Sequence, residues 1–363
     1  MITKADDYPV HQTPEPIAFA GTDRNFYDRY FFNGYNEDAS VFFAVALGVY
    51  PQLGIIDAAF CLSVNGKQHN IRASRHSNGE RMDTAVGPIE IRIIEPLNQI
   101  RILLLDNDSG ITADICFHAR HRPIEEPRFI RRNGTRLFMD YTRMTQNGGW
   151  SGAITVAGET ITLSPANYMG TRDRSWGIRP VGSAESQPPI GGNLAQFFWI
   201  WAPCNFPDHI SFAHSNDDAN GLPWNRCAVF GDVGAEPIEI ATPSFTLSYH
   251  SGTRRVQSAT CEMGSGLATR YEMTGFKFYM SGLGYTHPVW GHGMDHGKLE
   301  IGYDAIDLTA IDDNAPEFIH IQSFCNAVLT IDGTAHSGRG VFEQFLLGPH
   351  LPSGFSGLLD AAA

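Results

Sequence analysis

The residues best suited to chemistry are crowded into one decapeptide at the middle of the chain, residues 170–179. If this segment is a strand, side chains alternate between its faces, so Arg172, Arg174 and Trp176 share one side and Asp173 lies on the other. An Asp173 carboxyl facing an apolar cavity would have a raised pKa and could act as a general acid. If a guanidinium meets it instead, Asp173 is a structural counter-ion. Both interpretations stay open from the residues alone.

A second polar segment lies shortly before residue 300 and combines aromatic side chains, histidines and one carboxylate. Its candidate residues are Tyr285, Trp290, His292, Asp295 and His296. The four-residue spacing of His292 and His296 invites a metal-site interpretation, but the intervening glycine disfavours a helix that would place both on one face. We expect no metal here. We expect either a hydrogen-bonded loop at a barrel mouth, or a polar lip over a ligand cavity in which His292 or Asp295 handles a proton.

Aromatic residues are frequent around both segments. Trp199 and Trp201 alternate with Phe198 and Ile200, so one face of that strand carries both indoles. Core packing is one explanation. The other is an apolar ligand pocket, whose indoles could also stabilise a developing carbocation by cation–π attraction.

Composition excludes several functions. The formal net charge of −13, without a basic run, argues against a nucleic-acid partner or an anionic membrane surface. We expect no signal peptide and no membrane span. Six scattered cysteines are typical of reduced thiols, which predicts a cytoplasmic protein. No phosphate-binding or dinucleotide fingerprint occurs in its required context, so we expect no cofactor.

The elements that must position these residues are strands. Residues 89–95 alternate apolar and charged side chains with period two, and the Asn65-Gly66 pair predicts a hairpin turn between two further strands. Helical periodicity is weak throughout, so the pattern predicts an all-β protein with two antiparallel barrels or sandwiches. We place the boundary after residue 168, because Pro165 closes the preceding hairpin; a boundary near 190 is the alternative. The expected domains are residues 1–168 and 169–363.

The two polar segments resemble motifs of a known superfamily. Residues 172–179, RDRSWGIR, resemble the RD-x-SWG-x-R signature of the AttH-like, hydroxyneurosporene synthase (carotenoid 1,2-hydratase) superfamily. Residues 285–293, YTHPVWGHG, are similar to an HP-x-WGHG segment of bacterial relatives. The resemblance implies two lipocalin-like β-barrels in tandem. It also implies chemistry on hydrophobic, prenyl- or polyene-like molecules without a cofactor.

Together these features lead to a hypothesis: a cofactor-independent hydratase, isomerase or cyclase acting on a C=C bond of a hydrophobic terpenoid, polyene or aromatic prenyl-like molecule. The expected catalytic residues are Asp173, Asp295 and His292. The expected substrate-binding residues are Tyr141, Arg172, Trp176, Arg179, Trp199, Trp201, Tyr285, Trp290 and His296. The alternative is a lipocalin-like carrier that binds a lipid, terpenoid or steroid without chemistry. The expected partner is a hydrophobic small molecule, and the sequence leaves a monomer and a homodimer open.

Overall fold

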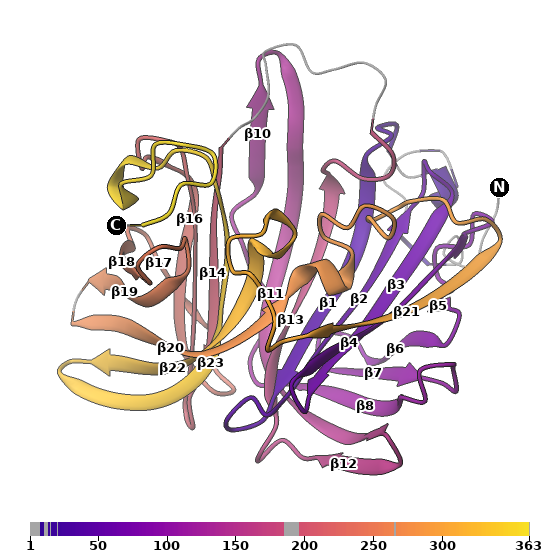
Figure 1. Cartoon of the computed structure of the whole chain (residues 1–363), viewed down its shortest axis with the longest axis horizontal. Coiled ribbons are helices and arrows are strands. Elements are labelled where there is room, and N and C mark those ends of the chain that lie inside the picture. Colours follow the sequence, from indigo (N-terminus) through magenta and orange to yellow (C-terminus); the bar gives the residue numbers. More distant parts are fainter. Residues whose placement is uncertain are drawn as a thin grey trace.

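The computed structural model describes residues 8–10, 14, 16–19, 21–184, 196–264 and 266–362. The protein is built almost entirely of antiparallel strands in two curled sheets that lie side by side (Figure 1). The first sheet is a nearly closed barrel and the second a half-barrel. The expected all-β fold of tandem barrel-like sheets is therefore confirmed. Within the described ranges, no helix is long and apolar enough to span a membrane.

The first sheet has the order β21-β4-β3-β2-β1-β13-β11-β8-β7-β6-β5, and the long strand β11 also pairs with β9, β10 and β12. Its strands are β1 (Phe26–Tyr35), β2 (Val41–Tyr50), β3 (Ile55–Val64), β4 (Lys67–His76), β5 (Ala85–Val86), β6 (Ile89–Glu95), β7 (Gln99–Leu104), β8 (Thr112–Ala119), β9 (Ile124–Glu125), β10 (Phe129–Asn133), β11 (Arg136–Val156), β12 (Glu159–Leu163), β13 (Met169–Ile178) and β21 (Leu299–Asp307). The expected Asn65-Gly66 turn joins β3 to β4, and both of its residues have positive φ.

The second sheet has the order β17-β16-β15-β14-β23-β22-β20-β19-β18. Its strands are β14 (Phe197–Asn205), β15 (His209–Asp217), β16 (Pro223–Asp232), β17 (Ile238–Ile240), β18 (Ser244–Tyr249), β19 (Val256–Gly264), β20 (Leu267–Tyr279), β22 (His320–Ile331) and β23 (Thr334–Leu347). Short 3₁₀ turns occur at η2 (Ile17–Phe19), η3 (Met280–Leu283), η4 (Pro316–Phe318) and η5 (Leu351–Ser353).

Two segments do not follow the expected division of the chain. Strand β13, which we expected to open the second barrel, lies in the first sheet between β1 and β11. Strand β21, from late in the chain, pairs with β4 at the edge of the same sheet. The boundary after residue 168 therefore does not coincide with the division between the sheets. The position of both strands depends on pairing with strands far away in the sequence, and local turn signals do not predict such pairing.

Three large apolar clusters form the core of the protein. One fills the first barrel, around Trp150 and Phe117, and another fills the second half-barrel, around Tyr271 and Phe342. The third lies between the sheets and contains Trp201. Because side chains alternate along each strand, β1, β11 and β13 contribute to the barrel interior with one face and to the space between the sheets with the other. That second face carries the candidate site.

Candidate functional site

A cavity of about 350 Å³ lies between the two sheets. Its walls come from β11, β14, β22 and β23, and from the segments that follow β13 and η3. Residues predicted as substrate-binding that line it are Tyr141, Arg179, Trp199 and Tyr285. Other lining residues include Arg143, Phe197, His320, Glu343 and Phe345. A mixture of aromatic faces and a few polar groups is typical of small-molecule sites of this size.

Asp173 lies on the face of β13 that looks toward the second sheet. It pairs with Phe31 on β1 and with Thr145 on β11, and Phe31 packs in the cluster between the sheets. The next residue of β13 on this face, Ser175, pairs with the cavity-lining Arg143. Arg172 and Arg174 lie on the opposite face, inside the first barrel, as the alternation predicts.

Burial raises the pKa of the Asp173 carboxyl to about 7. Arg143 and Arg29 oppose this shift, whereas the carboxylates of Glu126 and Glu343 reinforce it. No described side chain donates a hydrogen bond to this carboxyl at hydrogen-bonding distance. Desolvation thus dominates, and the site can hold a protonated carboxylic acid near neutral pH.

Beneath the cavity lies a buried ion pair that the sequence did not single out. Arg143 donates to Glu126 through Nε at 2.8 Å and through Nη2 at 2.5 Å, and the Thr145 hydroxyl donates to the same carboxylate at 2.5 Å. Burial by itself would raise the pKa of Glu126, but Arg143 and His214 bring it below its ordinary value. The Arg143 guanidinium also lies 4.5 Å from the ring centroid of Trp199. The Arg143–Glu126 ion pair, with its hydrogen bond from Thr145, therefore forms a charged floor of the cavity.

A second buried carboxylate, Glu343, forms a wall of the cavity. It accepts hydrogen bonds from Trp199 Nε1 at 2.9 Å, His320 Nε2 at 2.8 Å and Gln322 Nε2 at 2.7 Å. Burial would raise the pKa of Glu343, but these donors bring it below its ordinary value. Because Nε2 of His320 donates to the carboxylate, Nδ1 is its other proton-transfer position, and no described residue hydrogen-bonds it. A histidine oriented by a carboxylate at a cavity wall is suited to general-base work.

The expected proton-handling role of His292 does not fit its contacts. Arg179 Nη2, which can only donate, lies 3.1 Å from His292 Nδ1, so Nε2 carries the proton and donates to the Leu283 carbonyl at 3.0 Å. Burial, with Arg29 and Arg179 nearby, lowers the pKa of His292 well below its ordinary value. His292 is a neutral ring that positions Arg179, and both of its nitrogens are occupied.

Arg179 and Arg29 converge on Tyr285 at the cavity wall. Arg29 Nη1 donates to the Tyr285 hydroxyl at 2.7 Å, and the Arg29 guanidinium lies 4.8 Å from the Tyr285 ring centroid. The Arg179 guanidinium lies 4.5 Å from the ring of Tyr27 and 5.5 Å from that of Tyr285. The segment after η3 is thus bound to the first sheet by two cations.

Asp295 lies at the surface, and the expectation that it serves as an acid in a dry pocket is corrected. Its side chain is 68% exposed, and it accepts from the Gly297 backbone N–H at 2.8 Å with His76 Nε2 at 3.0 Å. These partners lower its pKa below the ordinary value. Neighbouring Trp290 stacks on His296 with ring centroids 4.2 Å apart, and neither lines the cavity between the sheets. Asp295 and His296 are therefore close in sequence to Tyr285 but do not join it at the cavity between the sheets.

The remaining predicted residues lie outside the cavity wall. Trp201 is buried in the cluster between the sheets. Arg172 is buried inside the first barrel, where its Nε donates to Gln146 at 2.8 Å. Trp176 lies on the same face of β13 as Arg172 and is 40% exposed. The decapeptide therefore divides by face of β13: Arg172 and Trp176 lie on one face, and Asp173 lies on the face toward the second sheet.

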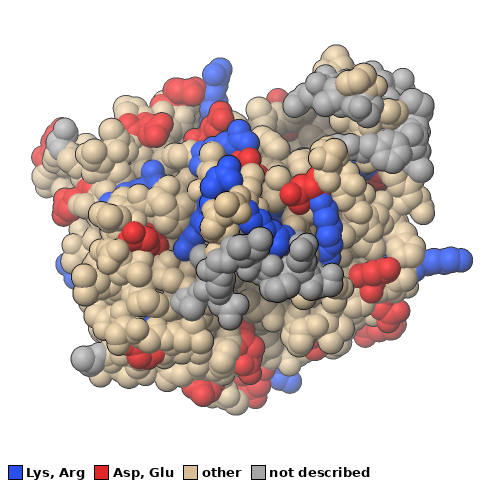
Figure 2. Space-filling view, turned by 90° about the horizontal axis from the view of Figure 1, so that it is seen from above, with Lys and Arg blue, Asp and Glu red and all other residues tan. Residues whose placement is uncertain are grey.

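Arginine and lysine side chains gather on one face of the molecule (Figure 2). Seen from above, Lys and Arg side chains form a band across the middle of the molecule, with Asp and Glu spread around it (Figure 2). The β10–β11 hairpin at the top of Figure 1 carries arginines at 128, 131, 132 and 136. The Arg131 guanidinium lies 5.6 Å from the ring of the cavity-lining Phe197 and 5.0 Å from that of Trp224. Arg131 therefore lies beside the cavity, whereas Arg128 is paired with Asp140, its Nε 2.6 Å from the carboxylate.

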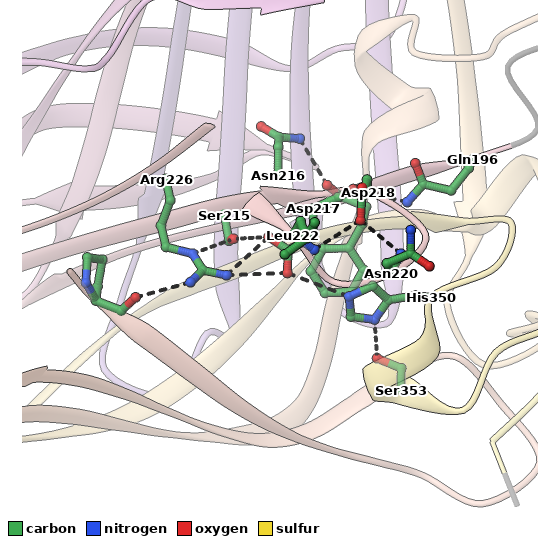
Figure 3. Close-up of polar contacts among 12 residues, drawn as sticks. Gln196, Ser215, Asn216, Asp217, Asp218, Asn220, Leu222, Arg226, His350 and Ser353 are labelled. Atoms are coloured by element: carbon green, nitrogen blue, oxygen red, sulfur yellow. Dashed lines mark hydrogen bonds and ion pairs between the residues drawn. The ribbon is translucent and has the colours of Figure 1, made fainter. Parts of the chain in front are cut away.

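A further polar cluster lies at the second sheet, beside a cavity of about 280 Å³ (Figure 3). His350 Nδ1 is 2.7 Å from the Ser353 hydroxyl, and His350 Nε2 is 3.5 Å from Asp217. This order of groups is that of a hydrolytic triad, but the N–H groups of Ser353 and Gly354 are taken by carbonyls of their own turn. The Ser353 hydroxyl also lies 2.6 Å from the Tyr249 hydroxyl, so these contacts tie η5 to the second sheet.

Fold and site together define an all-β protein of two curled antiparallel sheets with a cavity between them. The chain is similar to a protein assigned as AttH from Nitrosomonas europaea, with 13% identity and a TM-score of 0.52, covering 93% of this chain and 98% of that one. It is also similar to kievitone hydratase from Nectria haematococca (14% identity, TM-score 0.48, covering 88% of each chain). A third similar structure is CghA (9% identity, TM-score 0.47, covering 90% of this chain and 89% of that one).

The AttH-type structure carries the comparison of folds, and its low identity restricts the conclusion to the fold. No curated protein sequence matches the chain. The profile of a family of unknown function (DUF8625) matches residues 2–356, and the chain belongs to that family.

The residues missed by sequence reasoning are Glu126, Arg143, His320 and Glu343. One signal was available: Glu343 interrupts the apolar run Val341-Phe342 and Phe345-Leu346, and a carboxylate inside a buried strand requires partners. The identity of those partners depends on strand pairing.

Proposed function

We propose that the protein is a cofactor-independent hydratase, isomerase or cyclase that acts on a C=C bond of a hydrophobic terpenoid, polyene or aromatic prenyl-like molecule. One observation carries the proposal: Asp173, whose burial raises its pKa to about 7, lies on the face of β13 toward the second sheet, one step along that face from Ser175, which pairs with the cavity-lining Arg143. An acid that keeps its proton near neutral pH can protonate an alkene.

In the hydration variant, the Asp173 O–H bond breaks and its proton forms a C–H bond at one alkene carbon, leaving a carbocation at the other. The aromatic faces of Tyr141 and Trp199 stabilise that cation. A water oxygen then forms the C–O bond, and its surplus proton passes to His320, which Glu343 orients. Loss of a neighbouring proton to His320 instead of water addition gives isomerisation. Attack by a second double bond forms a ring and a new cation, which then loses a proton to His320 to complete cyclisation.

The test is deuterium incorporation from D₂O into a panel of prenylated phenols and linear polyenes, followed by mass spectrometry. Wild-type protein is expected to place one deuterium on carbon in the product. Asp173→Asn should lose turnover by about two to four orders of magnitude, whereas the surface variant Asp295→Asn should match wild type.

Full turnover by a folded Asp173→Asn variant would remove the acid assignment. The alternative function, a carrier, would be supported if native mass spectrometry showed a retained, unmodified lipid while no alkene in the panel gained deuterium.

A further inference from the structure

The first barrel contains its own cavity, of about 740 Å³, which shares no lining residue with the cavity between the sheets. Its inner wall is formed by Asp28, Tyr30 and Arg174, and its outer part by the segment around Arg81 and by β6. This volume falls within the range of small-molecule sites. Arg174 belongs to the decapeptide, and the proposed alkene chemistry does not use it.

The inner wall has more positive than negative charge. Arg174 and Arg81 share the single carboxylate of Asp28, with Arg81 Nη2 at 3.3 Å and Arg174 Nη1 in closer contact. Arg172 does not line this cavity but lies on the same face of β13 as Arg174, and it has no acidic partner at ion-pair distance among the described residues. Its Nη2 is buried with no hydrogen-bond partner there. A buried cation without a counter-ion is costly unless an anion completes the site.

The acidic residues at the cavity mouth do not supply that counter-charge. Glu90 accepts from Arg92 Nε at 2.6 Å, and Asp83 lies 3.1 Å from Arg75 Nη2. Each of these carboxylates is neutralised by its own arginine. Among the described residues, one of the two positive charges of the Arg81–Arg174 pair therefore has no acidic partner.

The outer part of the cavity is apolar and exposed. Tyr8, Val10, Met82 and Ile93 line it and are 56%, 47%, 50% and 45% exposed. Exposed apolar side chains that gather at one opening mark an interaction site more often than a chance arrangement. Val49 and Ile91 continue the apolar wall inward.

We propose that the first barrel binds a long-chain carboxylate, with the carboxylate group on Arg81 and Arg174 and the hydrocarbon chain along the apolar mouth. Charge-assisted hydrogen bonds from guanidinium groups favour a carboxylate over an uncharged head group. The apolar mouth favours an aliphatic tail through its burial. This site is separate from the proposed alkene chemistry and stands without it.

Oleate is the probe, with oleyl alcohol as the same chain without charge, and binding is followed by titration calorimetry and native mass spectrometry. Wild type is expected to bind one oleate and to bind oleyl alcohol about tenfold more weakly, the loss expected for a charge-assisted hydrogen bond. Arg81→Gln should weaken oleate binding by about tenfold and leave oleyl alcohol unchanged.

Ile93→Glu places a carboxylate at the mouth and should also weaken oleate binding. Ile94→Glu is its matched control, because Ile94 is the next residue of β6, is 52% exposed and does not line the cavity. The proposal is overturned if wild type does not bind oleate. It is equally overturned if Arg81→Gln and Ile93→Glu both bind oleate as wild type does, which would place the ligand elsewhere.

Discussion

Replacing Asp173 with Asn should stabilise the protein at alkaline pH and have little effect in acid. The two side chains have nearly the same shape, so the substitution mainly removes the ability to ionise. In the folded protein burial raises the pKa of Asp173 from the ordinary 3.8 to about 7. Between these two values the folded state keeps a proton that the unfolded state has lost. Folding is therefore progressively penalised as pH rises from about 4 to about 7.

The size of the effect follows from the shift. Each pH unit in that window costs about 1.4 kcal/mol, so the full penalty is about 4 kcal/mol above neutral pH. Asp173→Asn does not carry this penalty. The free energy of unfolding of the variant, relative to wild type, should therefore rise by about 3 kcal/mol between pH 5 and pH 8.

Urea denaturation of both proteins at pH 5 and pH 8, followed by circular dichroism, measures this difference. Comparing the two proteins cancels every other titrating group, provided that only Asp173 differs. A gap that is the same at both pH values would refute the argument. If Asp173 were instead ionised and paired in the folded state, its pKa would lie below 3.8, and the variant would be less stable than wild type by the same amount at pH 5 and pH 8.

Three further substitutions test the site. Glu126→Gln leaves the buried guanidinium of Arg143 without its counter-ion, so the free energy of unfolding should fall by about 3–5 kcal/mol in urea denaturation; a loss below about 1 kcal/mol would contradict the buried pair. Asp295→Asn changes an exposed side chain and should alter that free energy by less than about 0.5 kcal/mol, so a larger drop would show a structural role for its bond to His76. His320→Gln should reduce alkene turnover by about two orders of magnitude while ligand affinity, measured by calorimetry, stays the same. Unchanged turnover would exclude His320 as the base.

The contrast between Asp173 and Asp295 shows what sequence patterns could predict. Both are single carboxylates within polar, aromatic segments, and the sequence favoured neither. Asp173 sits in a regular strand, where alternation determines which face it shares and with which neighbours. Asp295 lies in a loop, where no regular alternation predicts the direction of a side chain. Its exposure could therefore be learned only from the structure.

The charged groups beneath the cavity could not have been predicted from spacing. Glu126 and Arg143 are brought together because β9 and β11 pair, and His320 meets Glu343 through the pairing of β22 with β23. Each contact depends on strand register. Strand register is determined by the cooperative packing of whole sheets, so it cannot be predicted from a local sequence pattern.

By itself, the sequence determined that the chain forms antiparallel strands and that Asp173 faces away from Arg172 and Arg174. Period-two alternation and turn residues act over a few positions, so these features are readable locally. The tertiary structure decided which faces meet, and therefore that Asp173 looks between the sheets while Arg174 looks into the first barrel. It also decided the protonation of Asp173, because a pKa depends on desolvation and on charges that only folding brings near.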